Sequence, residues 1–285
     1  MKAKAIPRIM RIHNAFFGSL TVAITAVLFT KDIYIIAYGM LAYIFIASAQ
    51  NIINDIFDVE VDKINKPNRP IPSGAITIRE AYFLFYIFNA IGLVFSTISS
   101  LIIGNPYPFI LASIMIIVGV LYSWKLKIMG FIGNITVGIS FSIGYIYGIL
   151  ISTNVFTLTN TMLTALLFFS ISTTLLIARE IVKGIEDIKG DALRNVKTLA
   201  RTRGIKFASI IAAIFYLSAL IMFTAIYFLN VLSDYFIPFL VIGDVATILA
   251  IFYTLKGYEG SSKASLWGKV GAFDGLIGFL IGVLL

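Results

Sequence analysis

Long runs of apolar residues constrain this chain more than any other feature of its sequence. Each run has about 17–25 residues, the length that an α-helix needs to cross about 30 Å of hydrocarbon. Charged residues make up 13% of the chain, whereas soluble domains carry about 25%. The sequence therefore predicts an all-α polytopic membrane protein. Nine transmembrane helices are expected, at about residues 14–30, 33–53, 81–103, 106–124, 130–152, 159–179, 206–230, 235–255 and 267–285.

The basic residues are confined to alternate connections between these runs. The N-terminal tail and the connections after the second, fourth, sixth and eighth runs hold all of the 22 Lys and Arg residues except Lys31. Short connections rich in Lys and Arg remain on the cytoplasmic side of a membrane. We therefore predict a multi-pass protein of the cell membrane with a cytoplasmic N-terminus and an external C-terminus.

The chain has no cysteine and only one histidine, His13. A disulfide framework, a thiolate metal site and a cysteine nucleophile are therefore excluded. One histidine also leaves no room for a metal site built from several histidines. Any metal site in this chain must use mainly oxygen ligands.

A cluster of acidic residues follows the second apolar run. Asp55, Asp58 and Asp62 are spaced by three and four residues, and Asn54 precedes Asp58 by four. On a helix that continues from the second run, these side chains lie along one face. Carboxylates in a row repel one another unless a cation lies among them. Mg²⁺ accepts carboxylate oxygens and usually bridges to substrate phosphates, so it is the ion that this pattern favours.

A second acidic cluster follows the sixth run, where Asp187 and Asp191 are four residues apart. Both clusters follow even-numbered runs, so both are expected at the cytoplasmic surface. This spacing suggests two four-helix units, each with an acidic site at the same depth. Together the clusters could hold two or three Mg²⁺ ions around one diphosphate. The alternative is that both clusters are solvated loops beside the membrane.

Basic and aromatic residues accompany both clusters. Lys66 and Arg69 follow the first, Lys183 lies within the second, and Tyr122 and Lys125 lie between them in the sequence. Cations beside a diphosphate would neutralise the charge of the leaving group. A phosphate on an acceptor could use Lys66, Lys183, Lys197 and Arg201. The alternative is that these residues only obey the positive-inside rule.

The two clusters resemble the motifs of the UbiA superfamily of intramembrane prenyltransferases. The residues from Asn54 to Asp62 match its first motif, NDxxDxxxD, and Asp187-xxx-Asp191 matches its second, DxxxD. The resemblance covers the whole chain, 1–285, as one transmembrane domain with cytoplasmic motif loops at about 54–80 and 180–205. It implies catalytic residues that hold magnesium and diphosphate, namely Asn54, Asp58, Asp62, Asp187 and Asp191, with Asp55 as a further metal ligand close by.

The resemblance also implies substrate-binding residues. Arg69 and Lys125 would contact the diphosphate, and Asn14 resembles a polar family position near the site. One departure is visible, because archaeal members often carry an aspartate directly after the lysine that is here Lys183. Gly184 cannot ligate a metal, so any role of a carboxylate there is lost or passes to Glu180 or Glu186.

Within the superfamily, Lys66–Gly74 and Arg179–Ile181 look most like the archaeal branch of ether-lipid synthesis. That resemblance implies an Mg²⁺-dependent transfer of a geranylgeranyl group from its diphosphate to geranylgeranylglyceryl phosphate, a lipid acceptor. An aromatic or chlorin acceptor is the alternative, because chlorophyll synthases share a similar Asn-Arg-Pro-Ile-Pro-Ser-Gly stretch. The expected mechanism passes through an allylic cation that the apolar bundle shields from water.

Two other classes remain open. A secondary transporter would also be polytopic, but its acidic residues should lie in the middle of its helices. Asp244 and Asp274 do lie within predicted spans, where we expect structural hydrogen bonds to Ser, Thr or Tyr. A CDP-alcohol phosphotransferase would need an Asp-Gly-xx-Ala-Arg string, which does not occur in this sequence.

Overall fold

The computed structural model describes residues 3–188, 190 and 196–285, and the regular elements in these ranges are all helices. Short 3-10 helices are η1 (Ala3–Ala5), η2 (Leu126–Ile128), η3 (Asp234–Phe236) and η4 (Gly257–Gly260). The α-helices are α1 (Ile6–Met10), α2 (Ile12–Val27), α3 (Ile33–Phe57), α4 (Val59–Asn65), α5 (Ile78–Ile103), α6 (Tyr107–Trp124), α7 (Phe131–Ser152), α8 (Asn160–Glu186), α10 (Leu199–Thr202), α11 (Ile205–Tyr227), α12 (Ile237–Leu255) and α13 (Ser261–Leu284).

Every predicted transmembrane run contains a helix, which confirms the all-α prediction. Eight helices in the described part of the chain are long and apolar enough to cross a membrane. The first predicted run corresponds to α2, which has only 16 residues, or about 24 Å at 1.5 Å per residue. The count of nine complete crossings therefore stays a prediction.

Local sequence signals explain several helix ends. The Asp32 side chain accepts hydrogen bonds from the first turn of α3. Thr77 and Glu80 form a reciprocal capping box at the start of α5, and Gly104 ends that helix with φ +75°. Glycine adopts this left-handed conformation without the steric cost that a Cβ imposes. These caps fix where the predicted runs begin and end.

The helices that lead into the two acidic motifs are longer than expected. α3 continues to Phe57 and α8 to Glu186, beyond the predicted ends of the second and sixth runs. The predicted motif loops, about 54–80 and 180–205, therefore begin with helical turns. Polar residues are compatible with these turns because helix hydrogen bonds join main-chain groups and do not depend on side-chain polarity.

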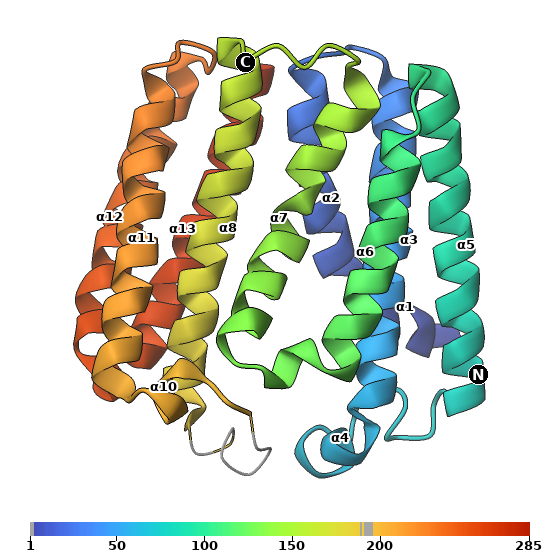
Figure 1. The fold of residues 1–285 in the computed structure, drawn as a ribbon, viewed down its shortest axis with the longest axis vertical. Coiled ribbons are helices and arrows are strands. Elements are labelled where there is room, and N and C mark those ends of the chain that lie inside the picture. The colour runs from blue at the N-terminus through green and yellow to red at the C-terminus, as the bar shows by residue number, and fades with distance from the viewer. Residues whose placement is uncertain (1–2, 189, 191–195) are drawn as a thin grey trace. The chain divides into compact units, whose positions relative to one another are not determined.

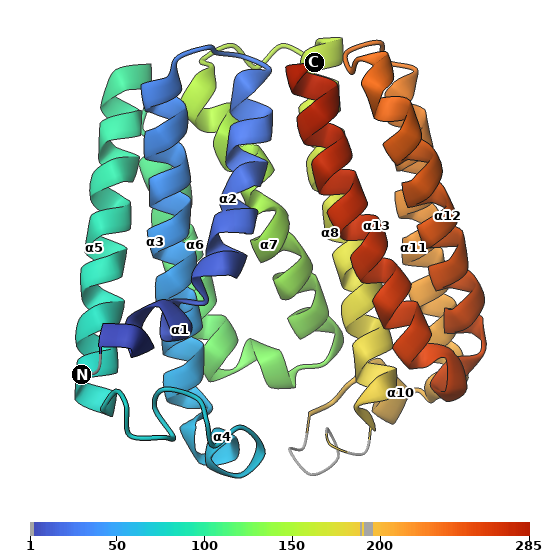
Figure 2. The same cartoon turned by 180° about the vertical axis from the view of Figure 1, so that it is seen from behind.

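The chain divides into two compact units, and α7 is shared between them, with its residues up to Ile146 in one unit and those from Tyr147 in the other. The first comprises Met1–Trp124 and Tyr147–Val155. Its central helix is α3, which packs against α2, α5 and α6 (Figures 1 and 2). The end of α7 also belongs here, because Gly148 lies against the carbonyl of Val22 on α2, where a Cβ would come within 2.6 Å of that oxygen.

The second unit comprises Lys125–Ile146 and Phe156–Leu285. Within it, α8 packs against α11 and α13, and α12 packs against α11 and α13. It also holds a group of aromatic rings packed in tilted, edge-to-face and stacked arrangements: Tyr145, Phe168, Phe223, Phe236 and Phe279. The hydroxyl of Thr224 on α11 donates to Asp244 on α12 over 3.0 Å. This bond is the structural role expected for that aspartate.

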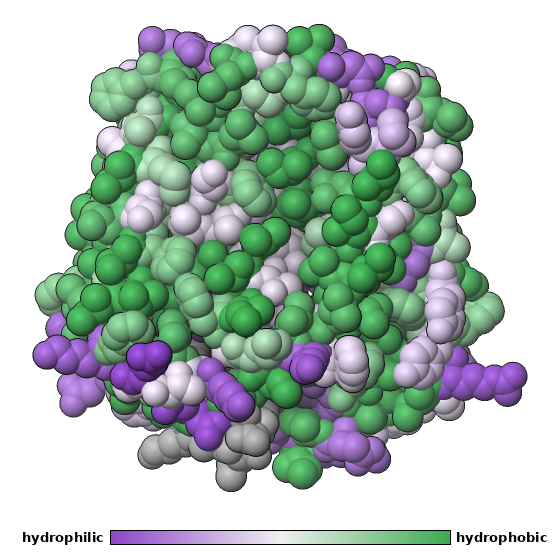
Figure 3. All heavy atoms as spheres, viewed as in Figure 1, coloured by the Kyte–Doolittle hydropathy of each residue, from purple (hydrophilic) through white to green (hydrophobic). Residues whose placement is uncertain are grey.

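The lateral surface of the helices is apolar. Large hydrophobic side chains such as Phe83, Ile117, Leu217 and Ile221 are exposed. Figure 3 shows hydrophobic residues covering the helices and hydrophilic residues near the helix ends. An exposed apolar surface of this kind is stable in lipid, which is the solvent that the composition indicates.

Candidate active site

The first acidic motif lies where α3 ends and α4 begins. Asp58 stands at this junction with φ −91° and ψ 1°, so its backbone is not α-helical. The hydrogen bonds nevertheless continue across it, from the Asp58 amide to the Asn54 carbonyl and from the Asp62 amide to the Asp58 carbonyl. The expected stripe of carboxylates therefore spans two helices joined at Asp58. Asn54 and Asp58 are half-buried there.

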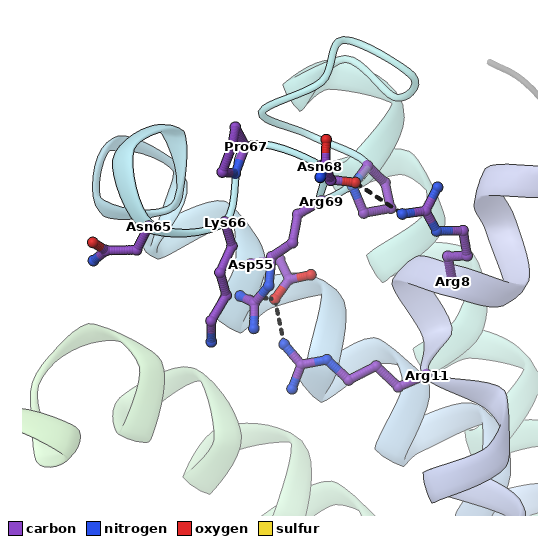
Figure 4. Close-up of a pocket in the computed structure, with 9 residues that line it drawn as sticks. Arg8, Arg11, Asp55, Asn65, Lys66, Pro67, Asn68 and Arg69 are labelled. Carbon is purple, nitrogen blue, oxygen red and sulfur yellow. Dashed lines mark hydrogen bonds and ion pairs between the residues drawn. The ribbon is translucent and has the colours of Figure 1, made fainter. Parts of the chain in front are cut away.

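Two arginines hold the carboxylates of this motif (Figure 4). One oxygen of Asp55, Oδ1, accepts from Arg11 over 2.5 Å and from Arg69 over 3.0 Å. Arg69 Nη1 also bonds Asp62 Oδ2. The side chains of Asp55 and Asp62 are only 4% and 6% exposed. Burying such charges is costly unless each one is paired, so the arginines are part of the reason that the motif can sit at a helix end.

The loop that carries Arg69 is held by backbone hydrogen bonds and by one buried side chain. The Arg69 amide donates to the Lys66 carbonyl and the Ser73 amide donates to the Arg69 carbonyl. Gly74 closes the turn with φ +72°, and the buried Ile71 packs with the core of the first unit. This hydrogen-bonded loop therefore positions the Arg69 guanidinium beside Asp55 and Asp62.

A basic pocket lies beside the first motif, with a volume of about 440 Å³. We use this name for the cavity whose charged lining is Arg8, Arg11, Lys66, Arg69 and Asp55. In Figure 4, the side chains of Arg11 and Arg69 converge on Asp55 from different elements, and the side chain of Lys66 lies beside that of Arg69. The lining thus has four cationic side chains and one carboxylate, and two of the cations contact that carboxylate. The arrangement is suited to an anionic ligand.

Sequence reasoning missed Arg8 and Arg11, which were covered only by the positive-inside rule. Arg8 Nη2 donates to the Asn68 carbonyl over 2.9 Å, which connects the N-terminal segment to the loop after α4. Arg11 lies between α1 and α2 with φ 50° and ψ 51°. A possible signal was that the two innermost bases of the tail are arginines whereas the outer ones, Lys2 and Lys4, are lysines, because guanidinium groups favour paired sites.

The second acidic motif lies at the end of α8 in the second unit. Asp187 caps this helix at its C-terminus and is exposed, and its amide donates to the Lys183 carbonyl over 2.8 Å. Lys183 is exposed as well. Asp191, the other predicted ligand of this motif, lies outside the described residues. Arg179 and Glu180 form a half-buried ion pair of 3.2 Å in the preceding turn.

The structure gives a packing reason for Gly184. It is buried, and a Cβ at this position would lie 3.3 Å from Thr198 Cγ2. The segment that contains Thr198 also approaches the turn after η2, because the Lys197 amide donates to the Ile128 carbonyl. A Cβ on Gly130 would lie 1.8 Å from the Lys197 carbonyl oxygen. Position 184 thus faces the chain that returns after the second motif.

Four of the six predicted substrate-binding residues do not line the basic pocket: Asn14, Tyr122, Lys125 and Lys183. Asn14 is exposed in the first turn of α2, and Tyr122 is half-buried near the end of α6. Lys125 is exposed and precedes η2 in the second unit. The structure thus brings Lys66 and Arg69 to one pocket, and the substrate roles of the other four stay predictions.

The donor chemistry of the first motif fits a magnesium ion. Its side chains offer carboxylate and amide oxygens, which are the ligands of hard cations. No group of three or more Asp, Glu, His or Cys residues forms a ready metal cage in the described part of the chain. Mg²⁺ does not need one, since it usually binds through one or two carboxylates together with water and substrate phosphates.

Fold and site together define a class: a multi-pass helical membrane protein with paired aspartates and arginines at a helix end. Comparison with known proteins gives the family. The profile described as the UbiA prenyltransferase family matches residues 15–273. This chain therefore belongs to the UbiA prenyltransferase family and is a prenyltransferase, which decides against the transporter and phosphotransferase alternatives.

Individual relatives agree with this assignment. The chain is 36% identical over 288 residues to the digeranylgeranylglyceryl phosphate synthase of Saccharolobus solfataricus, covering 100% of this chain and 98% of the relative. A solved structure concerned with digeranylgeranylglyceryl phosphate synthase is 30% identical, with a TM-score of 0.82, and covers 99% of this chain and 98% of that one. A UbiA homologue from Archaeoglobus fulgidus bound to DMAPP and Mg²⁺ shares the fold, with a TM-score of 0.65, 17% identity and coverage of 99% and 100%.

Proposed function

We propose that this protein transfers a geranylgeranyl group from geranylgeranyl diphosphate to the free hydroxyl of geranylgeranylglyceryl phosphate. The carbon–oxygen bond to the diphosphate breaks, and an ether bond forms between the prenyl carbon and the acceptor oxygen, which loses its proton. The observation that carries the proposal is the similarity over the full chain to relatives with the name digeranylgeranylglyceryl phosphate synthase.

The geometry of the first motif supports an anionic substrate that binds together with a metal ion. We assign Asn54, Asp58 and Asp62 to the binding of magnesium and diphosphate, with Asp187 and Asp191 of the second motif as further ligands. Bound Mg²⁺ would withdraw charge from the diphosphate as it leaves. Arg69 already contacts Asp55 and Asp62, so its guanidinium is held next to the proposed ligands.

Asp55 has a different part in this proposal. The same carboxylate oxygen accepts from two guanidinium groups, so we assign Asp55 to the orientation of Arg11 and Arg69. The active site faces the cytoplasm, as the distribution of Lys and Arg predicts. An apolar bundle would keep water away from the reacting prenyl carbon.

The test is a transfer assay with purified full-length protein, labelled geranylgeranyl diphosphate and Mg²⁺. Product should form with geranylgeranylglyceryl phosphate and fail to form with 4-hydroxybenzoate or a porphyrin. Chelation of all divalent ions should reduce turnover to background, and added Mg²⁺ should restore it.

The opposite acceptor pattern would reject the ether-lipid assignment and favour the aromatic or chlorin alternative. Full turnover after chelation would reject the metal assignment. A heat-treated sample provides the background rate for both measurements.

A further inference from the structure

The lining of the basic pocket holds more cations than carboxylates. Its lining has four cations, Arg8, Arg11, Lys66 and Arg69, against Asp55 alone. Asp62, which is outside the lining, pairs with Arg69, whereas the hydrogen bond of Arg8 goes to a neutral carbonyl. A cavity of about 440 Å³ with this excess attracts an anion.

Arg8 is the cation of this pocket whose hydrogen bond least reduces its ability to bind an anionic ligand. Its hydrogen bond goes to the Asn68 carbonyl, a neutral acceptor, and its side chain is exposed. This bond holds the N-terminal segment against the loop that carries Lys66 and Arg69. Arg8 is therefore both positioned and able to bind phosphate oxygens.

Arg11 shows that the pocket is built in advance of ligand binding. The residue adopts a left-handed backbone between α1 and α2, a conformation uncommon for any residue with a Cβ. The bend directs its guanidinium to Asp55 and Asn51, and Asn51 in turn donates to the Met10 carbonyl. Strain of this kind is maintained where surrounding contacts demand a particular side-chain position.

We propose that the basic pocket binds the phosphate monoester of the lipid acceptor directly, without a metal ion. Arg8 and Lys66 would contact its oxygens, while Asp55 orients Arg11 and Arg69 around it. Guanidinium groups bind phosphate oxygens in a paired geometry and need no bridging cation. The inference rests on the proposed function, because it presumes an acceptor that carries a phosphate.

The pocket suits a monoester better than the diphosphate of the prenyl donor. A diphosphate bound through Mg²⁺ requires carboxylates that ligate the metal, whereas the one carboxylate that lines the pocket, Asp55, is engaged by Arg11 and Arg69. The pocket nevertheless shares Arg69 with the first motif. The phosphate and the reacting hydroxyl of the acceptor belong to one three-carbon glycerol unit, so their two sites must be neighbours.

The test compares Arg8→Gln with the wild-type protein and with Lys4→Gln as a matched control. Lys4 is an exposed base of the same N-terminal segment and is not among the pocket residues. We expect Arg8→Gln to raise KM for geranylgeranylglyceryl phosphate about tenfold, equivalent to about 1.4 kcal/mol. Its KM for geranylgeranyl diphosphate should change less than about twofold, and Lys4→Gln should leave both values unchanged.

A second arm removes the phosphate from the ligand instead of the charge from the protein. With geranylgeranylglycerol as acceptor, Arg8→Gln and wild type should have the same kcat/KM, since the interacting phosphate is gone. Inorganic phosphate should compete with the phosphorylated acceptor in the wild-type protein and compete less well in Arg8→Gln. Thermal unfolding of each variant verifies that it is folded.

Several results would overturn the inference. An increased KM for geranylgeranyl diphosphate would make the pocket a donor site. An Arg8→Gln effect seen in phosphatidylglycerol nanodiscs but absent in phosphatidylcholine would make the ligand a bulk lipid headgroup. Identical kinetics of Arg8→Gln and Lys4→Gln would reject the inference while the proposed function stands. If wild-type protein does not use the phosphorylated acceptor at all, the proposed function fails and the inference fails with it.

Discussion

Asp55 and Asp187 are both acidic residues near the end of a long apolar helix, yet their surroundings differ. Asp55 is buried in the last turn of α3, where Arg11 and Arg69 donate to one of its oxygens. Asp187 is exposed at the C-terminal cap of α8. The first motif is thus held in position by cations of the protein itself. We infer that the carboxylate of the second motif acquires its electrostatic partner from the metal ion and the substrate.

The largest expected effect follows from removing the buried carboxylate. Asp55→Ala should destabilise the protein by about 3–5 kcal/mol, because two guanidinium groups lose the acceptor that they share. Transfer activity should fall with it, as Arg11 and Arg69 are no longer oriented. Unfolding in detergent, followed by circular dichroism, measures the change in stability.

Asp55→Asn is the matched variant for this comparison, because it keeps the shape and the acceptor oxygen but removes the charge. It should be more stable than Asp55→Ala and less stable than wild type. If Asp55→Ala were as stable as wild type, the ion pairs would contribute nothing to stability. The contrast between the two motifs would then be wrong.

The second expected effect concerns activity alone. Asp187→Ala should reduce the rate of transfer by about 10²–10³-fold, the scale seen when one electrostatic contact to the transition state is removed. Its Tm should remain within about 2 °C of wild type, because substitutions at exposed positions seldom change stability much.

The distinguishing measurement is the dependence of the rate on Mg²⁺. Asp187→Ala should require a higher concentration of Mg²⁺ than wild type for half of its maximal rate. Lys183→Ala should not require a higher concentration. An Asp187→Ala variant that unfolds would show that the second motif is a structural element like the first.

The smallest expected effect is at Gly184. Gly184→Ala gains up to about 1 kcal/mol of helix propensity and meets Thr198 Cγ2 at 3.3 Å. These terms oppose each other, so Tm should change by about 2 °C or less and KM values should be unaffected. Thermal unfolding and initial rates measure both.

Thr198→Ser sharpens this test because it removes the methyl group that Gly184→Ala would contact. In that background, Gly184→Ala should be more stabilising than in wild type. A large loss of stability in both backgrounds would instead show that position 184 tolerates no side chain.

Much of the fold follows from the sequence because lipid allows few solutions. An apolar run in hydrocarbon must satisfy its backbone internally, so a run such as that before Asn54 becomes a helix whatever it packs against. The chemistry of the acidic motifs could be inferred in the same way. Carboxylates at helical spacing with no Cys and one His leave a hard cation as the natural ligand.

Helix ends and the length of α2 were harder to predict. Hydropathy fails to locate the ends of α3 and α8, because their last turns are polar although they remain helical. The first run appeared long enough to cross a membrane, but Arg11 starts α2 at Ile12 and the helix ends at Val27. Such boundaries depend on caps and backbone turns that composition does not encode.

By itself, the sequence determined the helical membrane architecture, the family motifs and the oxygen-rich ligand set, since each depends on residues that are neighbours along the chain. Only the tertiary structure decided that Asp55 pairs with Arg11 and Arg69, which are 44 and 14 positions away. The left-handed turn at Arg11 and the loop before α5 bring these charges together. Pairing across such separations follows from packing and burial, and no local spacing rule predicts it.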